Sequence, residues 1–383
     1  VQEALILAEP GDVIEFAEGT FEFTRGLSLD VDNVTVRGQG MDRTVLSFKN
    51  QDAGSEGLIV TSDGVSLEYF AIEDTIGDAI KTKGCDGINF IGVRVEWTGG
   101  PKETNGAYGL YPVECKNVLI DGCVAVGASD AGLYIGQSQN IIVRNSIAKY
   151  NVAGIEIENS YYADVYNNVA MHNTGGILVF DLPNLPQQGG HSVRVFANMS
   201  VDNDTPNFAP KGNIVANVPM GTGLLIMANR NVEVFDNTFS GNATANLIVS
   251  SYRRGPEEKV DPNYYPYPEA IHIHNNRFGT GGDNPSGPLG MLAANAVGTP
   301  IPDILWDGVA NPEKLNDGKL PKEDWIYIHD NGVATYGNAN FPAFMADPEN
   351  AKPMFDISAH EGSLPPVKPV VLGGSAESRA DTD

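Results

Sequence analysis

Six ionisable side chains recur in this sequence within short apolar stretches, and together they have the groups needed for acid–base chemistry. Lysine offers a positive charge, tyrosine a weakly acidic hydroxyl and an aromatic face, and glutamate a base or, when protonated, an acid. Such a set could neutralise a negative charge on a substrate and move a proton beside it. The six residues are Lys81, Lys83, Tyr111, Tyr134, Glu156 and Glu158.

Each of these residues belongs to a strand-like segment that opens with a small residue or glycine. The segments read DAIKTKG, GLYPVEC, GLYIGQS, GIEIENS and GILVFD. Their first inward apolar residues align as Ile80, Leu110, Leu133, Ile155, Ile177, Leu224 and Leu247. If successive segments stack in this register, Tyr111, Tyr134 and Glu156 become neighbours in space despite their distance along the chain.

A second set of segments repeats with the same spacing: CDGINFIG, KNVLIDG, QNIIVRN and YADVYNN. Their inward anchors include Val65, Ile88, Val118, Ile141 and Ala163, which gives a base period of about 22–23 residues with insertions. Apolar residues return two positions after each anchor, which is typical of strands. The pattern predicts an all-β chain folded as a single-stranded right-handed parallel β-helix, in which stacked rungs bury one continuous core.

Asparagine recurs five residues after the anchor in five rungs. One interpretation is a buried ladder, in which each amide bonds the next at the strand spacing of about 4.8 Å. The alternative is that asparagine merely favours turns. The residues are Asn168, Asn198, Asn237, Asn276 and Asn331.

The composition restricts the possible partners. The formal net charge is −25 and the pI about 4.5, which argues against nucleic acid and anionic membranes. No apolar run is long enough for a membrane span. We expect an N-terminal cap at 1–10 with an amphipathic helix over Val1–Ala8, a β-helix with inserted loops and a C-terminal cover at 11–362, and an extended or flexible tail at 363–383.

Four insertions, 99–105, 181–190, 202–222 and 253–269, interrupt the repeats. Long loops of a repeat protein gather on its functional face, so they are expected to wall a groove over the glycine-opened strands. An apolar field lies next to the polar one in this alignment, and loops 181–190 and 202–222 would cover it. The field consists of Leu178, Phe180, Leu225, Met227 and Ile248.

Cysteines and histidines suggest further sites. Cys85 and Cys115 stack in adjacent rungs, either as a disulfide or as free thiols, and Cys123 is expected to be buried. His274 and His329 are equivalent outward residues that could bind a metal together with His272. The same column continues into Tyr166, Phe196 and Phe235, which favours packing under a covering segment, so we assign no metal and no other cofactor.

The opening PGDVIEFAEGTF, the GIEIENS and NVLIDGC rungs and the asparagine column resemble the pectate-lyase-like superfamily of right-handed parallel β-helices, over residues 9–280. Within it, the repeats are similar to those of the NosD-like carbohydrate-binding and sugar-hydrolase group, which includes mannuronan C5-epimerases. The resemblance implies polysaccharide chemistry in an extracytoplasmic setting. The epimerase signature Asp-Pro-His-Asp is replaced by Gly-Ile-Glu-Ile-Glu at 154–158.

Two functions remain open. The first is a lyase or C5-epimerase on acidic glycans, periplasmic or secreted, with polysaccharide or cell-surface glycan as its partner. The second is a non-catalytic binding or scaffold protein, in which the charged residues are an ordinary solvated face; the oligomeric state stays open. In the first hypothesis the catalytic residues are Tyr134, Glu156, Glu158 and Lys81, and the substrate-binding residues are Lys83, Tyr111, Phe180, Asp181 and His191, the last as a possible acid or base.

Overall fold

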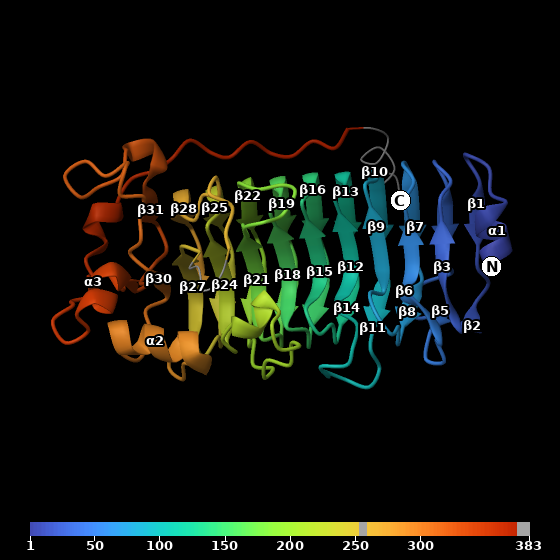
Figure 1. Ribbon diagram of the computed structural model, residues 1–383, viewed down its shortest axis with the longest axis horizontal. Coiled ribbons are helices and arrows are strands. Elements are labelled where there is room, and N and C mark those ends of the chain that lie inside the picture. Colours follow the sequence, from blue (N-terminus) through green and yellow to red (C-terminus); the bar gives the residue numbers. More distant parts are fainter. Residues whose placement is uncertain (253–258, 374–383) are drawn as a thin grey trace.

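The computed structural model describes residues 1–252 and 259–373 and winds them into a coil of three parallel sheets, which Figure 1 shows from the side. Each turn of the coil adds one strand to sheet A, one to sheet B and one to sheet C, except the last turn, which adds none to sheet B. Parallel strands joined in this way take the right-handed crossover. The predicted right-handed parallel β-helix is therefore confirmed.

The strands have the following bounds. Sheet A comprises β1 (Val13–Glu15), β4 (Thr35–Arg37), β7 (Val65–Glu68), β10 (Asp86–Ile91), β13 (Lys116–Asp121), β16 (Gln139–Arg144), β19 (Tyr161–Tyr166), β22 (His191–Phe196), β25 (Arg230–Phe235), β28 (Glu269–His274) and β31 (Ile326–His329). Sheet B comprises β2 (Gly19–Glu22), β5 (Thr44–Ser47), β8 (Ala71–Glu73), β11 (Arg94–Glu96), β14 (Val124–Val126), β17 (Ile147–Lys149), β20 (Val169–Met171), β23 (Met199–Val201), β26 (Thr238–Ser240) and β29 (Arg277–Phe278). Sheet C comprises β3 (Arg25–Leu29), β6 (Ala53–Val60), β9 (Ile80–Lys83), β12 (Tyr108–Val113), β15 (Ala131–Gly136), β18 (Ala153–Glu158), β21 (Gly175–Phe180), β24 (Thr222–Met227), β27 (Ala245–Ser250), β30 (Ile304–Trp306) and β32 (Tyr336–Asn338).

The strand register agrees with the alignment of the sequence. In sheet C, Leu110 pairs with Leu133 and Leu133 with Ile155. In sheet A, Ile88 pairs with Val118 and the pairing continues in step through later rungs. The inward residues of both sheets are buried. A shift of the pairing by one residue would turn these apolar side chains toward water, so their burial fixes the register.

Sheet B was not anticipated from the sequence. Most of its strands have three residues, and the single inward residue is often small, as in Ala125, Ala148 and Ala170, all 0% exposed. One small inward residue per rung gives no period-2 pattern, since alternation needs at least two inward positions to be visible.

The asparagine ladder is confirmed. Asn198 Nδ2 donates to Asn237 Oδ1 (3.0 Å) and to the Val165 carbonyl (2.8 Å), and Asn198 Oδ1 accepts from the backbone N–H of Asn168 (2.9 Å). A second ladder, which the sequence analysis missed, stands five residues further along at the turn between sheets B and C. It runs through Asn151, Asn173, Asn203 and Asn242.

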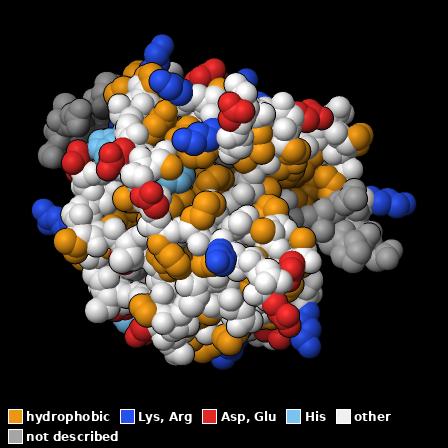
Figure 2. Space-filling model, turned by 90° about the vertical axis from the view of Figure 1, so that its left-hand side faces the viewer, with side chains coloured by type: hydrophobic (Ala, Val, Ile, Leu, Met, Phe, Trp, Pro, Cys, Tyr) orange, Lys and Arg blue, Asp and Glu red, His pale blue; other side chains and the backbone are white. Residues whose placement is uncertain are grey.

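Helices close the two ends of the coil. The expected N-terminal helix is present but shorter, α1 (Gln2–Ile6), and its Leu5 is 1% exposed against the first rungs. At the other end α2 (Gly287–Val297) was missed in a Gly- and Pro-rich stretch, and α3 (Phe341–Ala346) follows β32. Seen from that end, apolar and charged side chains are mixed over the surface (Figure 2). Three short 3₁₀ turns complete the described elements: Ile214–Asn217, Lys322–Asp324 and Ile357–His360.

The C-terminal segment 364–373, which we call the strap, runs extended along the outward face of sheet A toward the N-terminal rungs (Figure 1). The backbone N–H groups of Val367, Val370 and Gly373 donate to Glu233 Oε2 (3.0 Å), Asp164 Oδ2 (3.1 Å) and Asn117 Oδ1 (2.8 Å). These acceptors lie two rungs apart on β25, β19 and β13. Three residues of polyproline II span about 9.3 Å, close to two strand spacings of about 4.8 Å, so the strap and the coil stay in step. The expected tail residues 374–383 lie outside the described part of the chain.

The cysteines Cys85, Cys115 and Cys123 are all free and buried, which favours the free-thiol alternative for the first two. Cys123 is 0% exposed, and burial raises the pKa of its thiol to about 12.

Candidate functional site

Six side chains gather on the outward face of sheet C, in the rungs of β12, β15 and β18, and we call them the acidic–tyrosine cluster. Strand pairing places Tyr134 directly beside Glu156, and Tyr111 beside Lys81 one rung before. Four of the predicted site residues are therefore neighbours, as the register required. The cluster consists of Tyr108, Tyr111, Asp130, Tyr134, Glu156 and Glu158.

The three tyrosine rings pack against one another at the N-terminal side of the carboxyl groups. Ring centroids are 4.4 Å apart for Tyr108 and Tyr111, 4.5 Å for Tyr108 and Tyr134, and 4.9 Å for Tyr111 and Tyr134. Burial raises the pKa of Tyr111 to about 12 and that of Tyr134 well above its usual value. Burial raises the pKa of Tyr108 as well, so all three hydroxyls are protonated at neutral pH, and those of Tyr108 and Tyr134 donate to Asp130 and Glu158.

Tyr134 donates its hydroxyl to Glu158 Oε1 (2.7 Å), and Glu156 of the same strand, β18, pairs in register with Tyr134. Burial, followed by the charges of Asp130 and Glu158, raises the pKa of Glu156 well above its ordinary value. We therefore assign a proton to Glu156, whose Oε2 has no hydrogen-bond partner.

Asp130, in the turn before β15, connects the cluster to loop 202–222. Its Oδ2 accepts from the Tyr108 hydroxyl (3.4 Å) and from Asn213 Nδ2 (3.2 Å). Burial and the nearby charge of Glu158 raise the pKa of Asp130 to about 7. Loop 202–222 also packs Val215 and Val218, 3% and 5% exposed, over the cluster.

The two predicted lysines differ in their surroundings. Lys81 Nζ lies 4.9 Å from the centre of the Tyr111 ring, 3.9 Å from Glu56 and 4.0 Å from Asp78. It is the cation beside the cluster. Lys83 instead pairs with the exposed Glu114 at 3.8 Å, outside the cluster.

The other predicted substrate-binding residues do not join the cluster's polar groups. Phe180 is 1% exposed in the apolar field, and loops 181–190 and 202–222 cover most of that field as expected. Ile248 is the exception, because it packs with α2 instead. Asp181 holds loop 181–190 through the Gly190 N–H (2.7 Å), and burial raises its pKa to about 6. His191 lies on sheet A, stacked on Tyr161 at 4.6 Å, so it belongs to another face.

The polar field does not line an open groove, and the prediction of a groove over these strands is wrong in this respect. Tyr134 is 3% exposed, Glu156 1% and Glu158 8%, because loop 202–222 lies over them. Two hollows of the surface lie elsewhere. One of 540 Å³ is lined by Pro300 and Phe355, and one of 270 Å³ by His191, Arg230 and Glu269.

Three residues of the site escaped the sequence analysis: Tyr108, Asp130 and Asn213. Tyr108 was missed because strict alternation of inward and outward residues would place it inside the coil. A Cβ on Gly109 would meet Val95 inside the coil, so Gly109 and Leu110 both face inward and Tyr108 returns outward. The glycine that opens each segment is the signal of this interruption, because a glycine in a strand often marks a bulge.

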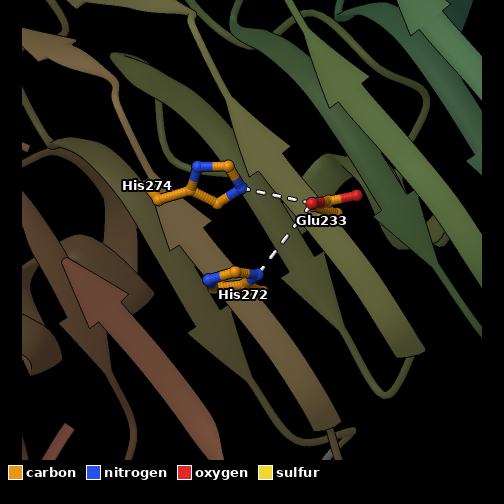
Figure 3. A group of neighbouring side chains, drawn as sticks. All are labelled: Glu233, His272 and His274. Carbon is orange, nitrogen blue, oxygen red and sulfur yellow. Dashed lines mark hydrogen bonds and ion pairs between the residues drawn. The ribbon is translucent and has the colours of Figure 1, made fainter. Parts of the chain in front are cut away.

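A second group of ionisable side chains lies on the outward face of sheet A. Glu233 of β25 pairs in register with His272 of β28, and His274 lies two residues further on. His274 Nε2 is 3.2 Å from Glu233 Oε1, and His272 Nδ1 is 3.9 Å from the same oxygen (Figure 3). Burial and the neighbouring His274 and His329 lower the pKa of His272 to about 4.

Comparison with known proteins agrees with the topology. Residues 78–257 match the family described as the right handed beta helix region. The match and the three stacked sheets define the chain as a right-handed parallel β-helix. No curated protein sequence matches the chain.

Several solved structures are similar. The A-module of the mannuronan C-5 epimerase AlgE6 of Azotobacter vinelandii shows 14% identity and a TM-score of 0.48, over 79% of this chain and 83% of that one. An alginate lyase of Paenibacillus sp. str. FPU-7 shows 15% identity and a TM-score of 0.44, over 75% of this chain and 93% of that one. An exopolygalacturonase of Thermotoga maritima shows 10% identity and a TM-score of 0.48, over 77% and 78%. Identities this low concern the fold and not the reaction. Among the described residues, no helix has the length and apolar character of a membrane span.

Proposed function

We propose that this protein acts on acidic polysaccharide as a lyase or C5-epimerase, in the periplasm or outside the cell, and that the acidic–tyrosine cluster is its catalytic site. The observation that carries the proposal is the burial of three carboxyl groups on an outward face of the coil. Burying ionisable groups costs stability, and groups with strongly shifted pKa values are enriched at functional sites.

Lyases and C5-epimerases of uronic acids share one difficult step, the removal of the C5 proton beside the sugar carboxylate. The proposed roles follow from the protonation of the cluster. Protonated Glu156, together with Lys81, would bond to the sugar carboxylate and stabilise the charge that develops on it. Glu158 would accept the C5 proton.

Tyr134, bonded to Glu158, would then supply a proton. In a lyase, the C5–H and C4–O bonds break, a C4–C5 double bond forms, and the leaving oxygen takes the proton of Tyr134. Glu158 then reprotonates Tyr134, so the cluster ends in its starting state. An epimerase must return the proton to the opposite face of C5, and Tyr134 lies on the same side as Glu158 (2.7 Å), so the geometry favours the lyase.

Substrate entry requires loop 202–222 to move off the cluster. Its contacts with the cluster include one polar bond, from Asn213 to Asp130, and the packing of Val215 and Val218. Loops that close over a site exclude water from the reaction and open on slower timescales.

The test is proton exchange at C5, which reports the step common to both reactions. Alginate and polygalacturonate are incubated with the protein in D2O, and deuterium at C5 and unsaturated chain ends are measured. Glu156→Gln and Tyr134→Phe should each lower kcat by about 100-fold or more, the usual contribution of an acid–base group. Asp236→Asn, which removes an exposed carboxylate on sheet A's edge, should leave kcat unchanged. Unchanged turnover in both cluster variants would remove the site assignment.

The second candidate is a non-catalytic glycan-binding or scaffold protein, and the 1% exposure of Glu156 favours it. This function predicts retention of glycan on an array without deuterium exchange or chain cleavage on any acidic polymer. The retention should persist in Glu156→Gln, because the buried carboxyl group would not touch the glycan. Loss of retention in that variant would contradict it.

A further inference from the structure

We propose that Glu233, His272 and His274 form a zinc site on the outward face of sheet A, beneath the strap. The site is separate from the acidic–tyrosine cluster, which lies on sheet C. Its ligand atoms are Glu233 Oε1, His272 Nδ1 and His274 Nε2, which all lie within 4.8 Å of one another.

The spacing of these atoms fits a small metal ion. Zinc binds imidazole nitrogen and carboxylate oxygen at about 2.0–2.2 Å, so tetrahedral ligands lie roughly 3.3–3.6 Å apart. Glu233 Oε1 is 3.2 Å from His274 Nε2 and 3.9 Å from His272 Nδ1. Both imidazoles point their nitrogen at the same carboxylate oxygen (Figure 3), and small movements would bring all three atoms to bonding distance.

Hydrogen bonds outside the site set the tautomer of His272. Asp330 Oδ2 accepts from His329 Nδ1 (2.9 Å), which in the neutral imidazole leaves His329 Nε2 as an acceptor. His329 Nε2 in turn lies 2.8 Å from His272 Nε2, which must then carry the proton. His272 Nδ1 consequently carries a lone pair, which faces the carboxylate oxygen Glu233 Oε1.

This lone pair is the observation that calls for a cation. His272 is 6% exposed, and its Nδ1 has no hydrogen-bond partner. Two buried acceptor atoms that face each other are unfavourable unless something positive lies between them. A proton does not satisfy the pair, because 3.9 Å is too long for a hydrogen bond.

The surroundings hold the other two ligands in place. The His274 ring is stacked between Phe235 at 5.3 Å and His329 at 5.2 Å, both nearly parallel to it. Glu233 Oε2 accepts from the Val367 N–H of the strap (3.0 Å), which leaves Oε1 free for the metal. Such outer contacts orient metal ligands in known sites.

The donor set selects zinc over calcium. Two imidazoles and one carboxylate suit zinc with a fourth position for water, whereas calcium takes six to eight oxygen ligands. Because the strap bonds the second oxygen of the same carboxylate, zinc would also fasten the strap to β25. The strap crosses the outward face of sheet A, where a segment covering the column of Tyr166, Phe196 and Phe235 was predicted from the sequence.

Zinc binding to the chelator-treated, dialysed full-length protein tests the proposal by calorimetry. We expect one Zn²⁺ per chain, with no competition from excess Ca²⁺. His274→Ala and Glu233→Gln should each weaken binding by about 100-fold or more, since even outer-shell changes cost 10–100-fold. Glu233→Gln keeps an acceptor for Val367, so it decides the matter if His274→Ala fails to fold.

His172→Ala is the matched control, because His172 pairs with Asp204 at another place on the surface (2.9 Å). It should bind Zn²⁺ like the unaltered protein. Cobalt(II) in place of zinc should give visible absorption bands of a four-coordinate ion, and Glu233→Gln should abolish them. No Zn²⁺ binding by the unaltered protein, or binding that survives in Glu233→Gln, would overturn the assignment.

Discussion

Replacing Glu156 with glutamine should stabilise the folded protein at pH 8 while it removes the proposed activity. The folded state holds the Glu156 proton to a higher pH than the unfolded chain does, since burial raises its pKa. At pH 8 the Glu156 carboxyl group loses its proton readily in the unfolded chain but not in the folded protein, and this difference favours the unfolded chain. Glutamine has the same shape and carries no charge, so it avoids this penalty, which for a buried carboxyl group is about 1–3 kcal/mol or more.

The sign can be followed in urea unfolding from pH 4 to pH 8. The pKa of Asp130 rises from its model-peptide range near 4 to about 7, and Glu156 shifts in the same direction. At a pH between the unfolded and the folded pKa of each group, the folded protein binds more protons than the unfolded chain. The free energy of unfolding should thus fall with rising pH, by up to about 1.4 kcal/mol per pH unit for each group.

Glu156→Gln should have a shallower pH dependence than the unaltered protein, and the two should nearly coincide at pH 4. Asp236→Asn removes one exposed negative charge and should change stability by no more than about 0.5 kcal/mol at any pH. A Glu156→Gln protein that is less stable by the same amount at pH 4 and pH 8 would show that the carboxyl group is a structural requirement.

Asn198→Ala should destabilise the coil by roughly 3 kcal/mol or more. Asn198 bonds to both neighbouring rungs, and its loss leaves the Val165 carbonyl, the Asn168 N–H and Asn237 Oδ1 without this partner. All these groups are buried, and each unsatisfied group costs about 1–3 kcal/mol. Urea unfolding monitored by circular dichroism measures the loss.

Asn217→Ala is the control for this effect. Asn217 is exposed in loop 202–222 and makes a 3.3 Å bond to the Ile214 carbonyl. Its replacement should change stability by no more than about 0.5 kcal/mol. If Asn198→Ala were equally mild, the ladder would not hold the rungs together.

The register of sheets A and C could be predicted from the sequence because each of their strands has two inward positions. Two apolar residues two positions apart indicate which face of a strand is buried. Examples are Ile155 with Ile157 in sheet C and Ala163 with Val165 in sheet A. The ladder of Asn198 could be predicted for the same reason, since a column in register becomes a stack in space. The residues of the second ladder lie five positions after those of the first column, so the same reasoning could have predicted it.

The burial of the candidate site could not be predicted in this way. Tyr134 and Glu156 lie where the register puts them, but their exposure depends on how loop 202–222 folds, and that loop occurs once. Repetition carries no information about a segment that is not repeated. The bond from Asn213 to Asp130 joins residues 83 positions apart, and no local pattern announces it. The strap is similar, because its step of three residues matches two rungs only once the spacing of the coil is known.

The strap changes how the solenoid can come apart. A simple stack of repeats unzips from whichever end is weaker, one unit at a time. Here the chain's last described residues reach back to Asn117 on β13, far from the rung in which they originate. Fraying of the C-terminal cap therefore pulls on the middle of the coil, and the terminal and central rungs melt as one cooperative block instead of as independent units.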